Sequence, residues 1–300
     1  MREAPQTVSL LVATMNDAVS PPGQKRKAAK TLVAAAGLIL IVSLLLPGVA
    51  HALDASVRVV SLKSCPAEYD QMMAALGSLL RDKFHLPVSQ PKLLLYPGRE
   101  AFESNLVHVA RFDPVYAREV AGWAVAVGAP DVVLANEEAL GRLSWPERIR
   151  VLAHELVHTV QYVLAGGRRS TSDQWLREGF ADWIAYRVLE SLDPVSLSSC
   201  QTPLYARIKG AARRLSSAPL SEMVTFDDFT RFRARYGGSS AYGESLLATE
   251  FLVERHGIQA VLVYFGLFRH SDDRLENFRF AFNEDLSAFA KEFAAYVDRI

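Results

Sequence analysis

The pentapeptide His154-Glu155-Leu156-Val157-His158 constrains this chain of 300 residues more than any other segment. On an α-helix, residues four apart share a face, so the two imidazoles can bind one ion together. Glu155 is rotated by about 100° around the helix axis and stays free to act on water. The pattern is typical of sites in which both histidines hold zinc and the glutamate is a general base.

The sequence around this pentapeptide predicts the helix that the pattern requires. Ser144 and Glu147 have the spacing of a capping box, and Pro146 falls in the first turn. Gly166 and Gly167 are expected to end the helix. Apolar residues recur between these limits at steps of three and four, at Ile149, Leu152, Leu156, Val160 and Val163.

A catalytic zinc ion normally takes three protein ligands and keeps one position for water. Metzincins supply the third ligand from a histidine shortly after the pentapeptide, with a glycine between. Gln161 and Leu164 occupy those two positions here, so the metzincin branch is excluded.

A second segment, Trp175–Asp182, carries two acids with helical spacing. We expect it to begin another helix, with Ser172 or Asp173 as the N-cap. Glu178 and Asp182 then share a face, and they repel each other unless a cation lies between them. Asp182 has the residue type and the spacing of a carboxylate that orients a metal-bound histidine.

Together these residues resemble the gluzincins, the thermolysin-like branch of zinc peptidases in the peptidase MA clan. That family has a His-Glu-x-x-His helix, then a glutamate on a second helix, often with an aspartate one turn later. The resemblance implies that His154, His158 and Glu178 bind one Zn²⁺ ion. It further implies that Glu155 is the general base and that Asp182 supports a ligand histidine.

The similarity extends over residues 90–300, although only the metal motifs are specific. The residues flanking both motifs look like bacterial exported peptidase-MA-like proteins. The segment from Ala241 to Gly257 resembles that group's tyrosine-containing helix, which implies Tyr242 as the oxyanion donor, with His256 as the alternative. The Gly-x-Met-Glu-Asn element of the aminopeptidases is absent, so exopeptidase activity is not implied.

The fold implied by this resemblance is α+β and zincin-like: a small N-terminal mixed sheet packs on the active-site helix, and a mostly helical part follows. We expect an α/β subdomain over residues 53–145 and a helical subdomain over 146–300. Apolar runs predict strands at Lys92–Tyr96, Trp123–Val127 and Val132–Ala135, the last two as a hairpin. Gluzincins bind substrate backbone along an edge strand, and either hairpin strand is a candidate, with an ordinary core strand as the alternative.

Residues 1–52 have the features of an export signal. Basic residues between Lys25 and Lys30 precede an uncharged apolar run, Thr31–Leu46, and Ala50-His51-Ala52 matches a cleavage site. An uncleaved anchor is the alternative, since residues 31–50 are long enough to span a bilayer. We therefore expect an exported protein, periplasmic or secreted, that contacts a membrane only if this segment is retained.

Charge and cysteine content limit the remaining possibilities. Beyond residue 52 the chain has 28 basic and 31 acidic residues, so no basic excess indicates nucleic-acid binding. Its two cysteines, Cys65 and Cys200, are either a disulfide formed in an oxidising compartment or two free thiols.

The expected activity is cleavage of a peptide or protein substrate. One alternative is a zinc-containing binding or assembly protein whose site is not used in hydrolysis. Glu155 argues against it, because a structural zinc site usually has four protein ligands and needs no base. Another alternative is a zinc amidase that acts on a non-peptide bond.

Overall fold

The computed structural model describes residues 69–192 and 220–299, all within one compact unit, Arg58–Ile300. It is a mixed α+β structure, mostly helical, with one small sheet. The predicted leader, Cys65 and Cys200 lie outside the described residues. None of the helices within those ranges combines the length and hydropathy needed to cross a bilayer.

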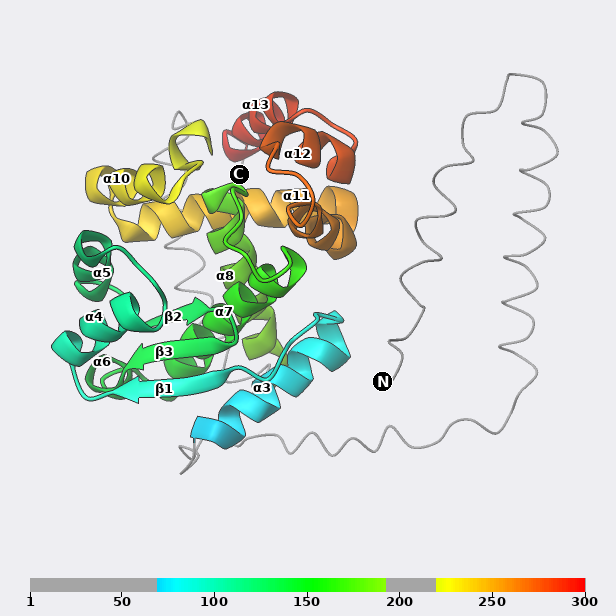
Figure 1. Cartoon of the computed structure of the whole chain (residues 1–300). Helices are drawn as coiled ribbons and strands as arrows, with labels where there is room; N and C mark the ends of the chain where they lie inside the picture. The colour runs from blue at the N-terminus through cyan, green and yellow to red at the C-terminus, as the bar shows by residue number, and fades with distance from the viewer. Residues whose placement is uncertain (1–68, 193–219, 300) are drawn as a thin grey trace, which may run out of the picture. The chain divides into compact units, whose positions relative to one another are not determined.

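The part before the pentapeptide helix mixes helices and strands. In order, it contains α3 (Tyr69–Phe84), β1 (Lys92–Tyr96), α4 (Arg99–His108), α5 (Pro114–Ala121), β2 (Ala126–Ala129), β3 (Val132–Asn136) and α6 (Glu137–Gly141). The sheet order is β1-β3-β2, with β1 parallel and β2 antiparallel to β3. Strand β2 is therefore an edge strand, and Figure 1 shows it next to the helix that carries the histidines.

The predicted strand at Lys92–Tyr96 and the predicted hairpin are both confirmed. The first hairpin strand begins at Ala126 instead of Trp123. The reason is local: the backbone N–H groups of Trp123 and Ala124 donate to Val120 O at 3.1 and 2.8 Å, which prolongs the end of α5. Asp131, with φ of 57°, makes the turn between the two strands.

The two faces of the sheet contribute to different cores because side chains alternate along a strand. Val133 and Ala135 of β3 point into the main core, which also contains the apolar face of the pentapeptide helix. Leu134 points the other way and packs in a smaller core with Phe102 and Val120 from α4 and α5. The sheet is thus covered on both faces and holds its edge strand against the helix.

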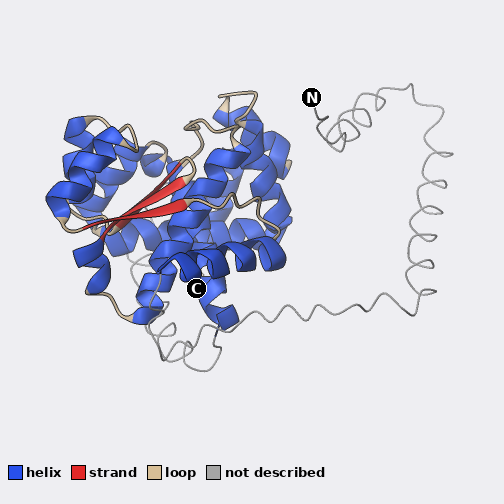
Figure 2. Cartoon of the chain, turned by 60° about the horizontal axis from the view of Figure 1, so that its bottom comes forward, coloured by secondary structure: helices blue, strands red, loops and turns tan. Residues whose placement is uncertain are grey.

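The rest of the described chain is helical, as predicted, and Figure 2 shows this dominance beside the three strands. It contains α7 (Trp145–Leu164), α8 (Gln174–Leu192), the 3₁₀ turn η2 (Leu220–Met223), α10 (Phe226–Tyr236), α11 (Gly238–Leu267), α12 (Arg274–Phe282) and α13 (Leu286–Val297). Gly257, the last residue of the segment that resembles a tyrosine-containing helix, lies inside α11 and makes a kink there with φ of 77°.

Helices α7, α8 and α11 pack against one another in the main core. Gly179 permits the closest approach, because a Cβ there would lie 2.1 Å from Ser245 O and 2.3 Å from Thr249 Oγ1. The absence of a side chain brings α8 onto α11. This contact fixes the helix that carries Glu178, the neighbouring residue.

Candidate metal centre

The two histidines lie on α7 as predicted, one turn apart and directed at the same point. The helix begins at the predicted capping box, where Ser144 N and Oγ donate to Glu147 Oε2 at 2.9 and 2.7 Å. The Nε2 atoms of His154 and His158 are 3.0 Å apart. His154 is buried and His158 nearly so, which leaves the two nitrogen atoms close together in a largely dry setting.

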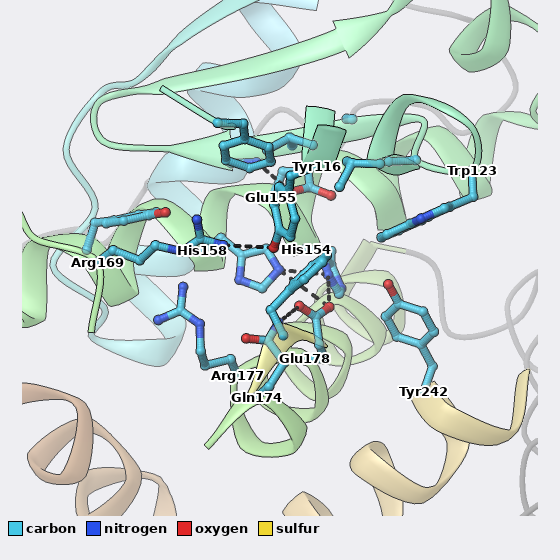
Figure 3. Close-up of a pocket in the computed structure, with 18 residues that line it drawn as sticks. Tyr116, Trp123, His154, Glu155, His158, Arg169, Gln174, Arg177, Glu178 and Tyr242 are labelled. Carbon is cyan, nitrogen blue, oxygen red and sulfur yellow. Dashed lines mark hydrogen bonds and ion pairs between the residues drawn. The ribbon is translucent and has the colours of Figure 1, made fainter. Parts of the chain in front are cut away.

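Glu178 brings a carboxylate from α8 to the same point. Its Oε2 lies 3.3 Å from His154 Nε2 and 3.6 Å from His158 Nε2. The other oxygen, Oε1, accepts a hydrogen bond from Gln174 Nε2 at 2.7 Å. His154, His158 and Glu178 therefore form a buried group that can hold a metal ion, and Figure 3 shows the three side chains converging.

The other ring nitrogen of each histidine, Nδ1, lies within hydrogen-bond distance of an acceptor oxygen. His154 Nδ1 lies 2.9 Å from Asp182 Oδ1, which also accepts from Arg150 Nη1 at 3.0 Å. His158 Nδ1 lies 3.0 Å from Gln161 Oε1, and Gln161 is itself held through its Nε2. In the neutral form of each ring these acceptors place the proton on Nδ1, so that the Nε2 lone pair faces the centre and can bind a metal ion.

The electrostatics of this group favour a cation between the three ligands. Burial alone lowers the pKa of His154, but the carboxylates of Asp182 and Glu178 raise it to about 10. Burial raises the pKa of Glu178, yet His158 and His154 hold it well below its usual range. A positive charge at the centre relieves the repulsion between the two carboxylates.

Glu155 lies beside the three ligands but is held by the edge strand. Gly128 N donates a 2.6 Å hydrogen bond to Glu155 Oε2. Burial raises the pKa of Glu155, while His154 and His158 act in the opposite direction. Position 128 requires glycine, because a Cβ would lie 2.3 Å from Glu155 O and 2.9 Å from the Cβ of His158.

Tyr242, on α11, lines the pocket beside His154, with ring centroids 6.3 Å apart. Its ring packs edge-on against Phe229 at 5.2 Å. Burial raises the pKa of the phenol well above its usual value, so the hydroxyl stays protonated and can donate. His256, the alternative donor, lies elsewhere: its Nε2 is 2.7 Å from Glu284 Oε1, and it does not line the pocket.

Two hollows meet at Glu155 and share a wall. Their common lining includes Trp123, Ala126 and Tyr242. Arg233 lines the second hollow, and its guanidinium carbon lies 3.7 Å from the centre of the Trp123 ring. The two hollows therefore adjoin beside β2, and the first of them contains all three residues that can hold a metal ion.

The sequence-based reasoning missed several residues of this centre. Gly128, Gln174 and Arg150 come from positions that no motif marks. Gln161 departs from the metzincin pattern, but its spacing of three from His158 places both residues on the same helix face and is the one signal of this contact in the sequence. The arginines of the pocket wall, Arg169 and Arg177, were also missed.

No protein-family model, curated protein or solved structure matches this chain.

Proposed function

We propose that this chain is a zinc-dependent hydrolase that cleaves peptide bonds. The observation that carries the proposal is the convergence of His154 Nε2, His158 Nε2 and Glu178 Oε2 within one pocket that also contains Glu155. Three ligands plus a separate carboxylate fit a catalytic site better than a structural one. A purely structural zinc site has no use for the additional acid.

The spacing of the ligand atoms supports zinc as the metal. Ligands about 2.0–2.2 Å from a tetrahedral ion lie about 3.3–3.6 Å from one another. Two of the observed separations, 3.3 and 3.6 Å from Glu178 Oε2 to the histidines, fall in this range, and the third, 3.0 Å between the two Nε2 atoms, is slightly shorter. A zinc ion held there would supply a Lewis acid for the scissile carbonyl and would lower the pKa of a water molecule.

The arrangement of elements supports a zincin-like, gluzincin-type fold. Helix α7 carries the pentapeptide, α8 carries Glu178 and Asp182, and a small mixed sheet lies against α7 with an antiparallel edge strand. These are the features that the resemblance to gluzincins implies. The order of the ligands along the chain is also the gluzincin order.

Glu155 is the base of the proposed reaction. One of its oxygens is fixed by Gly128 N, and no described residue hydrogen-bonds to the other, Oε1. Glu155 accepts a proton from the attacking water and passes it to the leaving amine.

Strand β2 offers a backbone edge to an extended substrate. Asn136 N donates to Val125 O, so alternate groups on the hairpin strand face β3, and those of Ala126 and Gly128 face the opposite edge. Gly128 N reaches Glu155 from that edge. A peptide that adds along β2 is carried directly over the metal ligands.

Tyr242 completes the proposed machinery as a hydrogen-bond donor to the oxyanion. Figure 3 shows it on the side of His154 opposite Arg169 and Arg177, at the edge of the pocket. No described residue forms a hydrogen bond with its hydroxyl, which is therefore available to a substrate. A donor to the oxyanion that forms during peptide cleavage contributes about 3–4 kcal/mol.

We further propose that the protein is exported. The support is the sequence of residues 1–52 alone, with its basic flank, apolar run and cleavage-like site. A peptidase outside the cytoplasm would meet peptide or protein substrates there.

The experiment that tests the proposal combines metal analysis with a peptidase assay. Purified protein should contain one zinc per chain and should hydrolyse members of a mixed peptide library. A chelator should abolish the activity, and added zinc should restore it. Stoichiometric zinc with no cleavage of any peptide would refute peptide hydrolysis and would favour the binding or amidase alternatives.

A further inference from the structure

Two arginines line the pocket wall next to His158. Arg169 lies in the loop between α7 and α8, and Arg177 lies one residue before Glu178. Figure 3 shows both side chains on the His158 side of the metal ligands, away from Trp123 and Tyr242. Both also line an adjoining hollow and so belong to the walls of both.

Arg177 is buried and forms no ion pair with another described residue. Only 8% of its surface is exposed. Its Nη1 donates to Ser170 Oγ at 3.2 Å, and its guanidinium lies over the ring of Tyr162 at 5.7 Å. A guanidinium has five N–H donors, and burying its charge without an anion is costly.

Arg169 is exposed and is held by aromatic rings instead of an acid. Its Nη2 donates to Tyr116 Oη at 2.9 Å. Its guanidinium carbon lies 5.3 Å from the centre of the Phe112 ring and 5.5 Å from that of Tyr116. These contacts orient the planar group but leave its charge unneutralised.

The acids around this pair have other roles. The carboxylate of Glu178 lines the same pocket and its charge acts on Arg177, but it belongs to the group that can hold the metal ion. Asp113 and Asp227 line the adjoining hollow. The Asp113 carboxylate caps α5, and Asp227 lies in the first turn of α10. Within residues 69–192 and 220–299, neither forms an ion pair with Arg169 or Arg177. Two positive charges therefore face the pocket together.

We propose that Arg169 and Arg177 form a subsite for a carboxylate group of the substrate, an inference that rests on the proposed peptidase function. The fork of a guanidinium matches the two oxygens of a carboxylate, and burial strengthens such a charged hydrogen bond. The carboxylate is either the C-terminus of a peptide or the side chain of an aspartate or glutamate. The subsite makes the chain selective for peptides that carry a carboxylate at a fixed distance from the scissile bond.

The test measures binding in the full-length, zinc-loaded Glu155→Gln protein, so that turnover does not interfere. The probes are a dye-labelled alanine hexapeptide with a free C-terminus, the same peptide as its C-terminal amide, and amides with one glutamate at each position. We expect at least one acidic probe to bind about tenfold more tightly than the neutral amide. Preference for the free acid identifies a C-terminal carboxylate, and preference for one glutamate amide identifies a side chain.

Equal affinity for all probes, or no binding of any acidic probe, would overturn the subsite. Its failure is distinct from failure of the peptidase proposal. Wild-type protein that hydrolyses no peptide but still prefers the acidic probe would refute the peptidase and leave the carboxylate subsite standing.

Arginine variants connect the preference to these two residues. Arg169→Gln and Arg177→Gln should each remove most of the tenfold preference, and Arg177→Lys should restore only part of it because lysine lacks the fork. Arg168→Gln is the matched control, because it removes a neighbouring exposed arginine that pairs with Asp272 outside the pocket. It should leave the preference for the acidic probe unchanged. If Arg177→Gln does not fold, the Arg169→Gln variant still tests the proposal, because Arg169 is exposed and its replacement should not prevent folding. An unchanged preference in folded, zinc-bound Arg169→Gln would contradict the proposal.

Discussion

The backbone N–H of Gly128 donates a hydrogen bond to Glu155 Oε2, with the two atoms 2.6 Å apart. This contact joins the edge strand β2 to the helix α7 that carries the metal ligands. It means that the fold itself, and not a bound substrate, fixes the orientation of the proposed base. The following predictions depend on this and on the other contacts of the centre.

Substitution of Gly128 by alanine should damage both stability and activity. A Cβ at this position would lie 2.3 Å from Glu155 O, so β2 would have to move away from α7. We expect a loss of about 1–3 kcal/mol in the free energy of unfolding, measured by urea denaturation, and a large fall in kcat/KM. Gly141→Ala is the control, since nothing lies within 4 Å of its added Cβ. If Gly128→Ala and Gly141→Ala have the same free energy of unfolding and the same kcat/KM, β2 does not approach α7 as closely as the structure shows.

Replacement of Glu178, the proposed metal ligand on α8, should release the metal. Glu178→Gln should lose stoichiometric zinc because a neutral amide is a poor ligand. Asp182→Asn should keep zinc but bind it about 10–100-fold more weakly, since it loses the charged partner of His154. Glu190→Gln, on the exposed side of the same helix, is the control. Full zinc occupancy in Glu178→Gln, measured by atomic absorption, would show that Glu178 is not the third ligand.

Loss of the Tyr242 hydroxyl should slow the chemical step without affecting the metal. Tyr242→Phe keeps the ring that packs on Phe229 and removes only the donor. We expect kcat to fall about 10²-fold, with KM and zinc content little changed. Tyr236→Phe on α10 is the control. An unchanged kcat in Tyr242→Phe would leave this tyrosine with a packing role alone.

Glu244 should make the fold less stable as the pH rises. Burial, and then the nearby charge of Glu222, raise the pKa of Glu244 from 4.5 to about 8. Between those values the folded chain holds a proton that the unfolded chain has lost, so stability decreases with increasing pH across this window. Glu244→Gln should melt near the wild-type temperature at pH 5 and several degrees higher at pH 8.5. If the difference in melting temperature between Glu244→Gln and the wild type is the same at pH 5 and pH 8.5, the pKa of Glu244 is not raised.

The sequence predicted those features of the fold that depend on local signals. The capping box at Ser144 and Glu147 and the apolar periodicity mark α7 correctly, because both act within one helix. The hairpin was likewise visible, but its first strand begins later than predicted. The competing hydrogen bonds from Trp123 and Ala124 to Val120 O continue the preceding turn, and residue type alone does not indicate them.

The candidate site divides in the same way. His154, His158, Glu178 and Asp182 are marked by spacings of four along two helices, and the structure brings them together. The contact from Gly128 could not be predicted, because it depends on how a sheet edge packs on a helix distant in sequence.

The most direct test of the account is the zinc content and peptidase activity of Glu155→Gln. The substitution keeps the shape of the side chain and removes only its ability to accept a proton, while all three metal ligands remain. The account predicts one zinc per chain, as in the wild type, and loss of hydrolysis of any peptide that the wild-type protein cleaves. Zinc-loaded Glu155→Gln that cleaves such a peptide at the wild-type rate would contradict it.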